Sequence, residues 1–96
     1  MKKSLSPKIE SQLLATHVAT NESFTTACFA GDGKKIMEIV ESEMEKNKLF
    51  TPGSKKLQED IRVMLQGRDR VPESIGKRVL EFVWNSYAKG IGLGVS

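Results

Sequence analysis

Apolar residues recur at helical spacing through most of the chain, in five stretches separated by turn residues. In the clearest stretch, Leu57, Ile61, Met64 and Leu65 stand at i, i+4, i+7 and i+8, which places them on one face of a helix. Gly, Pro, Asn and Asp residues lie at the breaks between stretches. The pattern predicts an all-α fold, a small bundle of four main helices plus one short helix, at about 7–19, 22–30, 33–48, 54–66 and 72–89.

Several helix ends carry capping residues. Asn21 offers an N-cap for the second stretch and Asp32 for the third, because short polar side chains accept hydrogen bonds from the first free amides of a helix. The fourth helix starts either at Thr51 with Pro52 or at Ser54, and Gly67 closes it. Residues 22–30 stay ambiguous, since the β-branched Thr25 and Thr26 also allow a strand.

The last stretch holds the only Trp and the only Tyr of the chain. Pro72 suits its first turn, and Gly90 can take the left-handed conformation that closes it. One apolar stripe contains Ile75, Val79, Phe82 and Val83, and a second contains Leu80, Trp84 and Tyr87. Together the two stripes make an apolar surface wider than a surface helix needs. The helix is therefore either central to the bundle, which the pattern favours, or covered by a partner on one face.

The 96 residues suffice for one domain. Residues 1–5 are expected to be disordered, residues 6–90 to form the single helical domain, and residues 91–96 to be a flexible or docked glycine-rich tail. The net charge of +3 is mildly basic, with acidic and basic residues interleaved. In the third helix the carboxylates are expected on the outer, solvated face: Glu38, Glu41, Glu43 and Glu45.

The residues that commonly carry chemistry are few and isolated. His17 is the only histidine and Cys28 the only cysteine, so neither has a second ligand of its kind at metal-binding spacing. Cys28 stands among Ala27, Phe29 and Ala30, the surroundings of a small buried apolar residue. The glycines match neither a phosphate-binding loop nor a dinucleotide cradle. We expect no catalytic residue, no metal, no cofactor and no small-molecule substrate, and hence no enzyme.

A single cysteine suits a reducing compartment, and no apolar run approaches the ~20 residues of a membrane span. We therefore expect a soluble cytoplasmic protein with no membrane partner. The predicted function is that of a small regulatory or accessory protein acting by protein–protein interaction, with a homodimer as one form. Its candidate interface is the second stripe of the last helix, Leu80, Trp84 and Tyr87.

The alternative function is nucleic-acid binding by a helix-turn-helix made of the last two helices. Its candidate contacts are the basic residues of positions 55–78, namely Lys55, Lys56, Arg62, Arg68, Arg70, Lys77 and Arg78. The supposed recognition helix, however, carries Leu80, Phe82 and Trp84 where polar base-reading side chains belong. This mismatch makes nucleic acid the second choice.

Overall fold

The computed structural model describes residues 7–92, with the side chains of residues 8–88. This part of the chain contains helices and no strand, which confirms the all-α prediction. The helices are α1 (Pro7–Ala19), α2 (Glu22–Ala30), α3 (Gly33–Lys46), α4 (Pro52–Leu65) and α5 (Glu73–Gly92). The segment left open between helix and strand is the short helix α2. The predicted outer parts of the chain, residues 1–5 and most of the tail, lie outside the described residues.

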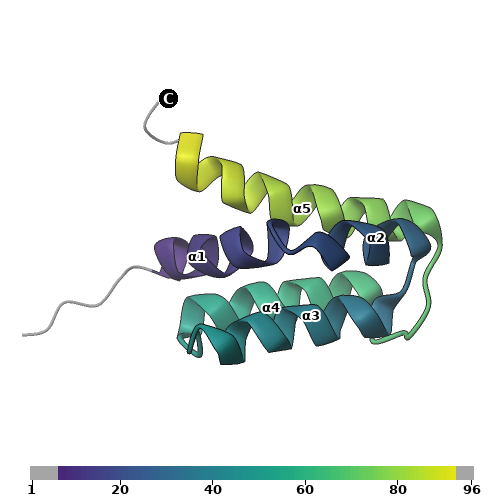
Figure 1. Cartoon of the computed structure of the whole chain (residues 1–96), viewed down its shortest axis with the longest axis horizontal. Coiled ribbons are helices and arrows are strands. Elements are labelled where there is room, and N and C mark those ends of the chain that lie inside the picture. Colours follow the sequence, from purple (N-terminus) through teal and green to yellow (C-terminus); the bar gives the residue numbers. More distant parts are fainter. Residues whose placement is uncertain (1–6, 93–96) are drawn as a thin grey trace, which may run out of the picture.

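The helices form layers around α1 and α2. Figure 1 shows α1 and α2 end to end in the middle, with α5 along one side and the pair α3 and α4 along the other. Helix α5 runs antiparallel to α1 and is long enough to cover both middle helices (Figure 1). The expectation that α5 is the central helix is therefore wrong. The middle position belongs to α1, whose Leu14, Ala15 and Val18 are fully buried.

The core is built from the apolar stripes of all five helices in this described part. Its fully buried members come from every helix and include Leu14, Phe24, Ile36, Ile61, Val79 and Val83. Each buried aliphatic or aromatic side chain of this kind contributes about 2 kcal/mol relative to exposure. Helix α5 takes part mainly through its first stripe, because Val79 and Val83 are fully buried, whereas Leu80 and Tyr87 of the second stripe are half-buried and Trp84 is 40% exposed.

Glu43 is a buried carboxylate of α3, and its expected place on the outer, solvated face is wrong. The side-chain amide of Asn21 donates a hydrogen bond of 2.8 Å to Glu43 Oε2. Asn47 Nδ2 donates to Glu43 Oε1 at 3.2 Å, and Lys46 lies 3.5 Å from Oε2. These partners replace water, so a charged side chain can be buried where the corner between α1 and α2 meets α3. Asn21 also caps α2 as predicted, since its Oδ1 accepts from Ser23 N–H at 2.8 Å.

Helix α3 begins as predicted and ends two residues earlier than predicted. Asp32 accepts a hydrogen bond of 3.0 Å from Lys35 N–H, which confirms its role as N-cap. At the other end Asn47 donates to the carbonyl of Glu43 twice, from its backbone N–H at 3.1 Å and from its side-chain Nδ2 at 2.8 Å. Lys48 then adopts a positive φ of 54°, which turns the chain away from the helix axis.

Helix α4 starts at Thr51 and Pro52, the earlier of its two predicted starts. Thr51 gives no side-chain hydrogen bond to the first amides of the helix. The carboxylate of Glu10 supplies one from α1 instead, because its Oε1 accepts from Gly53 N–H at 2.8 Å. Glu10 is thus a buried charge stabilised by the N-terminus of another helix.

The turn between α2 and α3 pairs with the link between α4 and α5 through backbone groups. Val71 N–H donates to Gly31 O at 2.8 Å, and Lys34 N–H donates to Asp69 O at 3.1 Å. Gly31 has a φ of +67°, and a Cβ there would overlap the carbonyl oxygen of Val71. Two segments far apart in sequence are therefore held in direct backbone contact, which only glycine permits at this point.

Both ends of α5 differ slightly from the prediction. Pro72 precedes the helix and accepts hydrogen bonds from the amides of Ile75 and Gly76. Gly90 does not close the helix, which continues through it to Gly92. Glycine allows the left-handed conformation but does not impose it, so a glycine near a helix end is a weak stop.

Candidate functional site

The second apolar stripe of α5 lies beside the core-facing stripe, on the flank where the helix surface passes from the core to solvent. We call Leu80, Trp84 and Tyr87 the outer face of α5. Leu80 and Tyr87 are half-buried and pack against the core, whereas Trp84 is exposed over 40% of its surface. The spacing i, i+4, i+7 keeps the three residues on one flank. Leu80 and Trp84 each follow a core residue, Val79 and Val83, by one position, so this flank is next to the core-facing one.

Trp84 and Tyr87 form an aromatic pair at the C-terminal end of this flank. Their ring centroids are 5.2 Å apart and their planes are inclined at 70°, an edge-to-face arrangement. The pair holds the Trp84 ring in one orientation while leaving much of its surface open to solvent. An exposed aromatic ring with restricted motion can enter a partner's pocket with little loss of conformational entropy.

The seven basic residues proposed to bind nucleic acid all lie at the surface. Three of them make intrahelical ion pairs: Lys56 with Asp60 at 3.6 Å, Arg62 with Glu59 at 3.7 Å and Lys77 with Glu73 at 3.7 Å. The others, Lys55, Arg68, Arg70 and Arg78, make no ion pair with a described residue. Exposed pairs of this kind contribute little to stability, so the side chains stay available to other charges.

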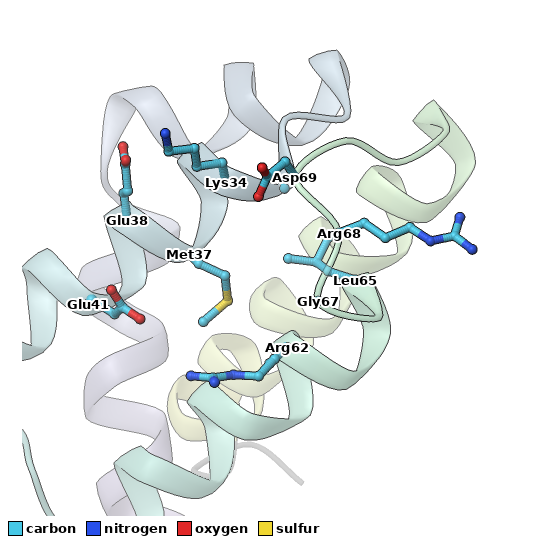
Figure 2. Close-up of a pocket in the computed structure, with 10 residues that line it drawn as sticks. Lys34, Met37, Glu38, Glu41, Arg62, Leu65, Gly67, Arg68 and Asp69 are labelled. Atoms are coloured by element: carbon cyan, nitrogen blue, oxygen red, sulfur yellow. The ribbon is translucent and has the colours of Figure 1, made fainter.

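Two of these residues line a groove of about 310 Å³ between α3 and the end of α4. In Figure 2, Met37 lies in the groove near Glu41 and Arg62, while the guanidinium of Arg68 points away from it. Three acidic residues, Glu38, Glu41 and Asp69, balance the basic Lys34, Arg62 and Arg68 of the lining. The groove therefore presents no excess positive charge to a phosphate backbone.

Two further basic residues occupy other parts of the molecule. Lys56 lines a second groove of about 360 Å³ formed by α1, α4 and α5, together with Lys8 and Phe82. The Lys77 ammonium lies over the ring of Phe29 on α2, 5.9 Å from its centroid. The structure thus distributes Arg62, Lys56 and Lys77 over three different environments and does not gather them on one binding surface.

Phe29 was missed as a surface residue by the sequence interpretation, which grouped it with the buried neighbours of Cys28. It is 47% exposed, because it is displaced by one residue from the buried positions of α2. The helical spacing of Phe24, Ala27 and Cys28, which share one face, was the signal that could have identified Phe29 as an outward residue. Its contact with Lys77 joins α2 to the outer flank of α5.

Cys28 is fully buried in the core, as its apolar surroundings indicated. Burial raises the pKa of its thiol from 9.0 to about 12. The thiolate is the reactive form of cysteine, and a raised pKa keeps the side chain in the neutral form at physiological pH. His17, on α1, is half-buried. Within residues 7–92 no group of His, Cys, Asp and Glu side chains is arranged to hold a metal ion.

We expect the native protein to resist thiol-specific reagents at pH 8. The difference between a pKa of 9.0 and one of about 12 lowers the thiolate fraction at that pH by about a thousandfold. Labelling with Ellman's reagent should therefore be slower than that of an unfolded control in denaturant by at least this factor. Comparable rates in the two conditions would show that Cys28 is accessible in the native state.

None of the helices in the described segment is long and apolar enough to cross a membrane. The chain matches no known family model, and neither a curated protein nor a solved structure is significantly similar to it.

Proposed function

We propose that this protein is a non-enzymatic regulatory or accessory protein that acts by protein–protein interaction through the outer face of α5. The observation that carries the proposal is Trp84, which is 40% exposed and is held edge-to-face against Tyr87. Trp and Tyr are the residues most enriched at the energetic centres of protein interfaces. Leu80 beside them adds apolar surface that is already supported by the core.

The setting that we propose is the cytoplasm, because a lone cysteine suits a reducing compartment. Nucleic-acid binding stays the alternative prediction. Its candidate residues are surface-exposed, as such contacts must be. The balanced charge of the groove at Arg62 and the separate positions of Lys56 and Lys77 make the protein-interaction role the stronger proposal.

Site-specific photo-crosslinking in the cells that make the protein tests the proposal. Benzoylphenylalanine at position 84 keeps an aromatic group on the outer face, and we expect it to give an adduct of discrete mass on irradiation. The adduct is then identified by mass spectrometry.

The matched control places the same group at Asn85, which is exposed on the neighbouring flank of α5. An interface centred on Trp84 predicts an adduct from position 84 and little or none from position 85. No adduct from position 84, or equal adducts from both positions, would contradict the proposed function.

A further inference from the structure

The outer face of α5 continues beyond Leu80 onto a cation and a second exposed aromatic ring. Lys77 stands three residues before Leu80 on the same flank, and its ammonium lies 5.9 Å from the centroid of the Phe29 ring. We call Phe29, Lys77, Leu80, Trp84 and Tyr87 the outer strip. From residue 77 to residue 87 it is about 15 Å long, at 1.5 Å per residue.

The two ends of the outer strip are chemically complementary to each other. One end carries the Lys77 ammonium beside the half-exposed ring of Phe29. The other end carries the exposed Trp84 ring, braced by Tyr87. Cations bind the faces of Trp and Tyr rings, and Trp is the best acceptor among the side chains. A surface whose ends attract each other suits a partner that presents the same surface in the opposite direction.

We infer that the occupant of the outer strip is a second copy of this chain, docked antiparallel about a two-fold axis that passes between Leu80 and Glu81. This axis lies midway between residues 77 and 84, so the rotation places Lys77 and Phe29 of each copy opposite Trp84 of the other. Such an isologous contact uses every favourable pair twice. The inference rests on the proposed function, whose interface it assigns to self-association.

The charges along the edge of the strip fit the same arrangement. Glu81 is exposed on α5, one turn after Lys77 and close to the inferred axis. In the antiparallel pair, Lys77 of one copy comes within about one helical turn of Glu81 of the other, which gives two pairs of opposite charge across the interface. The ammonium is already oriented by Glu73 of its own helix at 3.7 Å. Without the opposite lysine, the two Glu81 side chains near the axis would only repel each other.

A strip of this length covers less than the ~800 Å² per partner of a standard interface, so we expect a weak dimer with a dissociation constant on the order of 10–100 μM. Sedimentation equilibrium of the full chain from about 5 to about 500 μM brackets that range. Trp84→Ala should weaken the dimer at least about tenfold, because it removes the aromatic partner of both cations. Lys77→Glu should weaken it about fivefold or more.

Arg78→Glu is the matched control, since Arg78 is equally exposed on α5 but lies on another flank. It makes the same change of charge and should leave the dissociation constant unchanged. Lys77 and Trp84 are both exposed, and circular dichroism verifies that each variant keeps its helix content.

A cysteine next to a two-fold axis meets its own copy, which tests the position of the axis directly. Under mild oxidation Glu81→Cys should form a disulfide-linked dimer, whereas Asn85→Cys should not, because position 85 lies one helical turn farther from the axis and is well separated from its own copy. The native Cys28 does not interfere, because it is fully buried.

A concentration-dependent dimer that is weakened by Trp84→Ala and Lys77→Glu, and linked through position 81, supports the inference. The inference is overturned if the protein stays monomeric up to the highest concentration. It is also overturned if Trp84→Ala leaves the dissociation constant of the dimer unchanged. The photo-crosslink at position 84 separates the two proposals. A monomer with an adduct to a different protein overturns self-association alone, whereas no adduct at position 84 removes the proposed function as well.

Discussion

Gly76→Ala is expected to lower the free energy of unfolding by about 3 kcal/mol or more, although alanine is the better helix former by about 1 kcal/mol. Gly76 is buried in α5 where this helix crosses the end of α2. A Cβ there would overlap the carbonyl oxygen of Cys28 and lie 2.9 Å from its carbonyl carbon. Both are backbone atoms, so no side-chain rotation can relieve the clash and one helix must move.

Denaturant unfolding of the wild type and the variant, followed by circular dichroism, measures this effect. Asn85→Ala is the control, because it replaces an exposed residue in the same helix and should change stability by less than about 0.5 kcal/mol. A Gly76→Ala variant as stable as the wild type would mean that α2 and α5 are less closely packed than the structure has them. The loss is large for a domain of this size, whose total stability is on the order of 5–14 kcal/mol.

Gly31→Ala is expected to cost about 3 kcal/mol or more, because two effects coincide at this residue. Its φ of +67° strains any residue with a Cβ, and that Cβ would also overlap the carbonyl oxygen of Val71. The same carbonyl belongs to the residue whose amide donates to Gly31 O at 2.8 Å. Relief of the clash would therefore break the pairing between the α2–α3 turn and the α4–α5 link.

Gly67→Ala separates the two effects. Gly67 has the same φ of +67°, and nothing lies within 4 Å of the position that a Cβ would occupy. This variant should cost only about 1–2 kcal/mol, the strain of the left-handed conformation alone. Equal losses of stability in Gly31→Ala and Gly67→Ala would show that the backbone contact with Val71 contributes nothing.

The helices themselves were predictable from neighbouring residues. Asn21 and Asp32 cap α2 and α3 through hydrogen bonds to amides two and three residues away, which is why the sequence locates both helix starts. The errors lie where a local signal permits more than one outcome. Gly90 permits a helix stop without enforcing it, and α3 ends early because Lys48 adopts a positive φ that turns the chain away from the helix axis.

The candidate site was predictable in part. The spacing of Leu80, Trp84 and Tyr87 identifies a second apolar flank on α5, and the structure places these residues together on that flank. Phe29 could not be joined to them from the sequence, because its proximity to Lys77 depends on how α2 packs against α5. For the same reason the basic residues of positions 55–78 looked like one group in the sequence, while folding separates Lys56, Arg62 and Lys77.

Periodicity and capping act over a few residues, so the chain alone specifies five helices, their approximate limits and the apolar faces that must be buried. The tertiary structure decides which helix lies in the middle and which polar groups can be buried. Glu43 finds its partner Asn21 at a separation of 22 residues, and Glu10 reaches the amide of Gly53 over 43 residues. A buried charge is tolerated only when such a partner is present, and that partner is brought near by packing rather than by any local pattern.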